Sequence, residues 1–246
     1  MHVGLFVPCY IDQFYPQVAV ATMQLLEKHG CEVGFPTNQT CCGQPMANSG
    51  CEKESIDTAK LFIENFKEYD YIVGPAASCV YYVKKHYNIL EQTNEVAAVR
   101  NHIYDLSEFL IDVLKIDKVD AKFPYKVGLH TSCHGQRGLR MSQSSEINAP
   151  DFSKQRELLQ MVEGLELIDL DRKDECCGFG GTFCVSEEAV SSKMGKDRVA
   201  DHERHGAEVL TGGDVSCLMH MEGIIRRENK NIKVMHLAEI LNNSGF

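Results

Sequence analysis

This chain of 246 residues carries the same four-cysteine pattern twice. In each half, two adjacent cysteines followed by a glycine stand between one upstream and one downstream cysteine. The intervals are similar, with 31 and 36 residues on either side of the first pair and 42 and 39 on either side of the second. The pattern consists of Cys9, Cys41, Cys42 and Cys79 in the first half, and of Cys133, Cys176, Cys177 and Cys217 in the second. Thiolates repeated in this way indicate metal binding and favour iron and sulfur.

Adjacent cysteines fit a single zinc ion poorly, because structural zinc sites usually separate paired ligands by about two to four residues. In a cluster of several irons, neighbouring thiolates can reach different metal atoms, or one of them can bridge. Gly43 and Gly178 directly follow the two pairs. Glycine lets the backbone turn there and pass close to inorganic sulfur. We therefore expect all eight repeated cysteines to be iron–sulfur ligands.

Three further cysteines, Cys31, Cys51 and Cys184, have no counterpart in the repeat, and we interpret them as core or loop thiols. For the eight repeated cysteines, other interpretations stay open: small buried hydrophobic residues, a structural zinc site, or a redox dithiol. A metal cluster is favoured over core packing, because packing does not require adjacent cysteines at matching places in two halves.

The composition is typical of a globular protein from a reducing compartment. A hydrophobic content of 43% is enough for a core, and residues 1–8 lack the basic start of a signal peptide. Eleven cysteines in such a chain do not resemble a secreted disulfide scaffold, so we expect a cytoplasmic location. The apolar runs are shorter than the roughly 20 residues of a membrane span. A formal charge of −10 without a basic run argues against nucleic acid and anionic membranes as partners.

Strands and helices are expected to alternate in the same order in both halves. The predicted strands cover 3–7, 31–35 and 71–73 in the first half and 127–129, 167–170 and 209–211 in the second. The predicted helices lie around 18–26, 53–67, 158–162 and 187–204, and the tails 103–110 and 234–241 also match. Residues 140–152 are expected to form a loop.

This alternation predicts an α/β fold of two pseudo-repeated, doubly wound halves, 1–120 and 121–246, that meet near 117–123. Each half would contain a small parallel sheet. The cysteines follow the strands, so they should gather at the carboxyl edge of each sheet, where open α/β folds bind their ligands.

Common cofactor motifs are missing from the sequence. The glycine-rich run 178–181 does not continue as a dinucleotide fingerprint, because Phe183 occupies the third glycine position. A Walker A motif and a serine nucleophile elbow are also missing. No nicotinamide, flavin or ATP site is predicted, and no catalytic residue is assigned. His130 and His134 flank Cys133, where they could hydrogen-bond to a cluster sulfur, take up a proton, or be ordinary polar loop residues.

Motifs along nearly the whole chain resemble the CCG (cysteine-rich) domain family. They are CCGQP at 41–45, NSG at 48–50, SCH at 132–134, CCGFGGTF at 176–183, CLM at 217–219 and KVMHLAE at 233–239. The segment 176–183 is the most specific. Within the family, the chain is most similar to the lactate utilisation A proteins and is related to the cysteine-rich subunit of heterodisulfide reductase and to the iron–sulfur subunit of glycolate oxidase.

This resemblance implies an oxidoreductase subunit: an iron–sulfur electron-transfer component of a complex that converts L-lactate to pyruvate. It also implies up to two [4Fe–4S] clusters, a ferredoxin-type iron–sulfur protein as one partner and a third subunit as another. The alternatives are a thiol–disulfide oxidoreductase similar to heterodisulfide reductase and a non-redox zinc or scaffold protein.

The chain departs from the family pattern at two positions. Full CCG motifs end in CxxC and offer five thiolates, whereas Tyr82 and His220 stand where the fifth cysteines would be. Four thiolates in each half are still enough for an ordinary [4Fe–4S] cluster. The missing fifth thiolates argue against the thiol–disulfide alternative.

Overall fold

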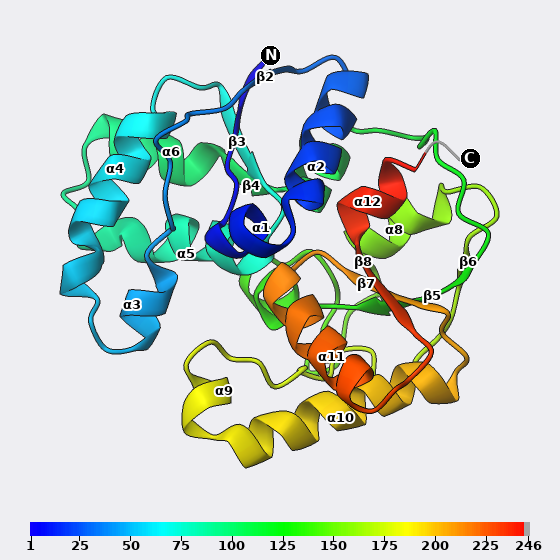
Figure 1. The fold of residues 1–246 in the computed structure, drawn as a ribbon. Helices are drawn as coiled ribbons and strands as arrows, with labels where there is room; N and C mark the ends of the chain where they lie inside the picture. The colour runs from blue at the N-terminus through cyan, green and yellow to red at the C-terminus, as the bar shows by residue number, and fades with distance from the viewer. Residues whose placement is uncertain (244–246) are drawn as a thin grey trace. The chain divides into compact units, whose positions relative to one another are not determined.

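The structure is a computed structural model that describes residues 1–243. The chain divides into two compact units, 1–114 and 115 onward. Within the described residues, each unit contains one four-stranded parallel sheet with helices between its strands (Figure 1). The predicted α/β fold of two repeated halves is therefore confirmed.

The two sheets have the same strand order. The strands are β1 His2–Leu5, β2 Glu32–Gly34, β3 Tyr71–Gly74 and β4 Ile103–Asp105, followed by β5 Lys126–His130, β6 Glu166–Leu167, β7 Val209–Gly212 and β8 Lys233–His236. The orders are β2-β1-β3-β4 and β6-β5-β7-β8, and all neighbours are parallel. Val3 pairs with Tyr71, and Val127 pairs with Val209. These pairings make Val3 and Val127 equivalent, and they set the alignment of the residues that follow.

Helices connect the strands because parallel neighbours require crossover connections. The first unit contains α1 Cys9–Phe14, α2 Pro16–Lys28, α3 Gln44–Asn48, α4 Ile56–Phe66, α5 Ala77–His86, α6 Asn94–His102 and α7 Leu106–Glu108. The second contains α8 Lys154–Gln160, α9 Phe183–Ser186, α10 Glu188–Arg204, α11 Val215–Arg227 and α12 Leu237–Leu241. Short 3-10 turns lie at Lys53–Ser55 and Tyr87–Ile89, and π-helical turns lie at Phe109–Val113 and His134–Gly138. The predicted helices correspond to α2, α4, α8 and α10.

The helix α2 illustrates how the pattern of the sequence produces an element. Its apolar positions recur at three- and four-residue intervals, and the face that they form is buried, as predicted. Pro16 occupies the first turn, where its missing N–H costs nothing. Thr22 is buried on the same face, and its hydroxyl donates to the carbonyl of Val18 at 2.7 Å.

The strand β6 ends earlier than the predicted strand 167–170. Its last ladder bond runs from the Ile168 N–H to the Val127 carbonyl at 3.0 Å. The amides of Asp171 and Arg172 then donate to the carboxylate of Asp201 in α10, at 3.3 and 3.2 Å, and not to β5. After Ile168, the backbone amides at 171 and 172 therefore bond to the Asp201 side chain on α10, and the strand does not continue through Leu170.

Within residues 1–243, no helix is long and apolar enough to cross a membrane. This agrees with the prediction from the short apolar runs. The predicted loop 140–152 contains no helix or strand, although Ser142 forms an isolated antiparallel bridge with Ser153.

Candidate metal centres

The four repeated cysteines of the first unit lie together at the carboxyl ends of its strands. Cys9 opens α1 just after β1, and Cys79 lies in the first turn of α5, after β3. The Cys9 and Cys41 Sγ atoms are 3.8 Å apart, and the Cys42 thiol interacts with both Cys41 and Cys79. The structure therefore brings together the four cysteines that the first half of the repeat predicts as ligands.

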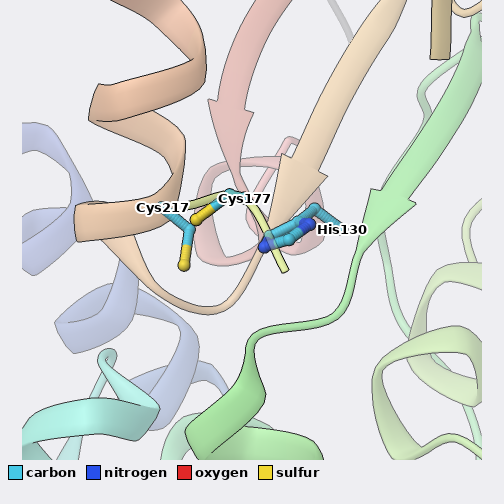
Figure 2. A group of neighbouring side chains, drawn as sticks. All are labelled: His130, Cys177 and Cys217. Atoms are coloured by element: carbon cyan, nitrogen blue, oxygen red, sulfur yellow. The ribbon is translucent and has the colours of Figure 1, made fainter. Parts of the chain in front are cut away.

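The second unit repeats this arrangement. Cys133 follows β5, and Cys217 lies in the first turn of α11, after β7. The thiol of Cys176 interacts with those of Cys133 and Cys177. Figure 2 shows the Cys177 and Cys217 sulfurs beside the ring of His130, and the three potential ligand atoms lie within 4.8 Å of one another.

Neighbouring thiols and backbone amides prepare one sulfur in each set for the thiolate form. Hydrogen bonds from the Cys42 and Cys9 thiols lower the pKa of Cys41. Hydrogen bonds from the Cys133 and Cys177 thiols likewise lower the pKa of Cys176. Cys9, Cys42, Cys133 and Cys177 have raised pKa values, chiefly because their thiols donate these hydrogen bonds and because they are buried. A thiolate is the form that binds metal.

A glycine in the left-handed region follows each cysteine pair, as the sequence predicts. Gly43 has φ of +91° and Gly178 has φ of +87°, which other residues rarely adopt. Their N–H groups donate to the Sγ atoms of Cys41 and Cys176 at 3.4 and 3.3 Å. At Gly178 a Cβ would also lie 2.7 Å from the Ser191 carbonyl oxygen, so the turn depends on glycine.

The helices α5 and α11 place the last cysteine of each set at a helix N-terminus. Asp214 caps α11: its carboxylate accepts from the N–H and the hydroxyl of Ser216 at 3.4 and 2.8 Å. Cys79 and Cys217 both lie in the first turn of their helices, where backbone N–H groups have no partner within the helix. Sequence reasoning missed both helices.

Tyr82 and His220, at the fifth positions of the family pattern, interact mainly with other groups. Tyr82 is 3% exposed, lies 3.4 Å from the Ser55 hydroxyl and stacks on His86 at a centroid distance of 5.2 Å. Burial raises its pKa, which favours a neutral phenol. The His220 Nε2 atom lies 3.3 Å from the Ser191 carbonyl. Both side chains are therefore held beside the cysteine loops by contacts that do not require a metal.

The three cysteines outside the repeat lie in different surroundings. Cys31 is buried, Cys51 is exposed, and Cys184 lies in α9, where its thiol donates to the Gly181 carbonyl at 3.0 Å.

His130 is the residue whose place the sequence left open. It ends β5, is 1% exposed, and lies among the potential ligand atoms of the second set. Burial and the nearby Arg198 hold its pKa well below the ordinary value, so the imidazole is neutral. His134 begins the π-helical turn after Cys133.

The donor set suits a metal or an iron–sulfur cluster. Each unit gathers sulfur atoms from several loops, with a backbone amide directed at one of them and the second cysteine of each pair buried. Cys42 and Cys177 are 1% and 2% exposed. Such sulfur-rich sets bind iron–sulfur clusters or zinc.

A model of the cysteine-rich domain CCG matches residues 3–84 and 127–222. Lactate utilization protein A of Halalkalibacterium halodurans is 43% identical over 249 residues, covering 98% of this chain and 97% of that protein. Lactate utilization protein A of Bacillus subtilis is 39% identical over 246 residues, covering 98% and 99%. Among solved structures, the match to glutamate racemase RacE1 from Bacillus anthracis covers 98% of this chain and 78% of the racemase chain, with 11% identity and a TM-score of 0.37. A likeness this low carries no information on activity.

Proposed function

Since the chain belongs to the family of CCG cysteine-rich domain proteins that includes the lactate utilization A proteins, we propose that it is an iron–sulfur electron-transfer subunit of a lactate-oxidising complex. The observation that carries the proposal is the convergence of four cysteines at the sheet edge of each unit. Cys9, Cys41, Cys42 and Cys79 would hold one cluster, and Cys133, Cys176, Cys177 and Cys217 the other.

When bound, an iron–sulfur cluster supplies a site that gains and loses single electrons. Conversion of L-lactate to pyruvate releases two electrons and two protons, so a chain with two such sites could pass on both electrons. The protein's own residues supply the thiolates, the amide donors of Gly43 and Gly178, and a buried position for the second cysteine of each pair. No residue of this chain is assigned to the lactate chemistry itself.

The remaining parts of the proposal follow from the same family membership. The electrons would pass to or from a ferredoxin-type iron–sulfur protein, with a third subunit in the same complex, and the complex would work in the cytoplasm. The two halves, 1–120 and 121–246, would each act as one cluster-binding domain.

Metal analysis of the whole chain tests this proposal. Protein purified without oxygen from iron-replete cells should contain iron and acid-labile sulfide in equal amounts, and about four irons per half if the clusters are of the [4Fe–4S] type. Reduction with dithionite should produce an EPR signal from the clusters. Zinc with no iron under these conditions would refute the proposal and support a structural zinc site.

A further inference from the structure

The two metal centres differ in the residue at the carboxyl end of their first strand. Because Val3 and Val127 occupy equivalent places in the two sheets, Phe6 is the counterpart of His130. Both side chains are buried, with exposures of 0% and 1%. The repeat thus has a phenylalanine at the end of the first strand in one unit and a histidine, beside the cysteines, at the equivalent place in the other.

His130 is held by a buried arginine. The Arg198 guanidinium is 0% exposed, and its Nε–H donates to the Nδ1 atom of His130 at 3.2 Å. The other guanidinium nitrogens donate to the backbone carbonyls of Leu129, Arg172 and Lys173. Asp201 adds an ion pair at 3.4 Å. The arginine is thus fixed on several sides, and so is the ring nitrogen that it contacts.

This contact determines the tautomer of His130. An arginine Nε–H can only donate, so Nδ1 must offer its lone pair and cannot carry a proton. In the neutral ring the proton then lies on Nε2. Within the described residues the Nε2 atom has no hydrogen-bond partner, although it is buried. The ring nitrogen farther from the backbone faces the sulfurs of Cys177 and Cys217 (Figure 2).

From this geometry we infer that His130 donates a hydrogen bond from Nε2–H to the cysteine thiolates of the second centre, and that Arg198 positions it for this role. The inference rests on the proposed function, because it requires a cluster at Cys177 and Cys217. It excludes His130 as a metal ligand, since a ligating Nε2 would need the lone pair that its proton occupies.

The fold itself does not require the polar pair. In the first unit, Phe6 packs edge-on against Phe62 with ring centroids 4.9 Å apart, and against Phe66 at 6.0 Å. That half forms the same sheet with an apolar cluster at this place. Burying a guanidinium and an imidazole is less favourable than burying phenyl rings, so a polar pair kept in one half indicates a role other than packing.

The hydrogen bond has a direct redox consequence. A donor to a cluster thiolate stabilises the reduced, more negative state and raises the reduction potential. The second centre should therefore be reduced more readily than it would be with a phenyl ring in the same place.

Variants that isolate each centre test the inference. Cys42→Ser should leave only the second cluster, and Cys177→Ser only the first. In the Cys42→Ser background, His130→Phe should keep the iron and shift the midpoint potential of the second cluster to lower values, as followed by EPR. In the Cys177→Ser background, the same His130→Phe change should leave the first cluster's potential unchanged, which makes it the matched control.

Two results with the isolated second centre would overturn the donor role: loss of its iron in the His130→Phe protein, which would make His130 a ligand, or an unchanged potential. Equal shifts in both backgrounds would overturn it too. Iron missing from both parent backgrounds as well as from the wild type would refute the proposed function, and the donor role with it.

The tautomer can be measured without any substitution. In metal-free wild-type protein labelled with 15N-histidine, two-bond proton–nitrogen correlations should show His130 with a protonated Nε2 and a bare Nδ1. The opposite tautomer, or a doubly protonated ring at neutral pH, would overturn the inference even where the variants fail to fold. Arg198→Met should remove this preference, while His134 should keep its wild-type spectrum in the Arg198→Met protein.

Discussion

Replacement of the second cysteine of each pair by serine should remove one centre and leave the other. Cys42 and Cys177 are the most deeply buried cysteines of their sets, and Cys177 packs in a core with Val199, Leu218 and Met221. Cys184, which follows this pair in the sequence, uses its thiol to donate to the Gly181 carbonyl. A serine hydroxyl at this place is a much poorer iron ligand than a thiolate.

The expected magnitude follows from the ligand count. Four thiolates hold one [4Fe–4S] cluster, so the wild-type protein would carry about eight irons and each variant about four. Iron and sulfide would be assayed per chain after anaerobic purification. EPR of the reduced protein would show which signal is lost, and it should be a different one in Cys42→Ser and Cys177→Ser.

Matched controls separate ligand loss from damage to the fold. Cys31→Ser also places a hydroxyl at a buried thiol, Cys51→Ser changes an exposed one, and Cys184→Ser changes a thiol close to the second pair. All three should keep iron near the wild-type content. Full iron content in Cys177→Ser would refute the second centre as described, and an equal loss in Cys31→Ser would show that the assay reports stability and not ligation.

Three further outcomes are expected. Tyr82→Phe and His220→Asn should keep both clusters, because these side chains contact Ser55 and Ser191; loss of iron from either variant, measured in the same assay, would make that residue a ligand. Burial lowers the pKa of His202 from 6.5 to about 3. Below pH 6.5 the unfolded chain therefore binds more protons than the folded chain. This histidine should cost up to about 1.4 kcal/mol of stability per pH unit as the pH falls towards 3. Between pH 7 and pH 5, urea unfolding of metal-free protein should therefore show a smaller loss of unfolding free energy for His202→Phe than for wild type. Equal losses would contradict the lowered pKa of His202. Finally, the purified chain alone should not reduce a dye with lactate, whereas a reconstituted complex should; fast turnover by the single chain would argue against an electron-relay role.

Three parallel strands of each sheet and the places of the cysteine pairs could be predicted, because both depend on local sequence and both occur twice. An apolar run gives a buried strand in a parallel sheet, and the chain direction then fixes which edge the next loop reaches. The glycine after each cysteine pair predicted a turn of the backbone, and the φ values of +91° and +87° at Gly43 and Gly178 confirm it. Repetition made the pattern more specific than either half would be alone.

The two helices that carry the last cysteines were harder to predict, for different reasons. The helix α5 begins after Ala76, which offers no side-chain cap, and its sequence is rich in β-branched and aromatic residues that favour strands. The sequence of α11 does contain helix signals: Asp214 is a good N-cap, and Leu218, Met221 and Ile225 recur at helical spacing. Reading that cap would have placed Cys217 at a helix N-terminus.

The role of His130 could not be derived from local sequence. Its tautomer depends on Arg198, which lies 68 positions away along the chain and reaches it only through the packing of α10 on the sheet. Alignment of the two halves does hold one signal, because Phe6 stands where His130 stands. That exchange marks the place where the repeat stops being symmetrical, but only the structure shows which atoms face the cysteines.

A comparison of how the two halves anchor their cysteine loops explains why the charge of Arg198 needs a separate reason. In the first half, Gln39 lies two residues before the pair and its Nε2 donates to the carbonyl of Leu5 at 3.1 Å. In the second half, Arg198 donates to the carbonyl of Leu129, the equivalent of Leu5. A neutral amide is thus enough to tie a loop to the end of its strand. Gln39, however, offers nothing to Phe6, whereas Arg198 must donate to the ring of His130. The buried guanidinium is therefore best explained by the histidine that it orients, and the anchoring of the loop accompanies that role.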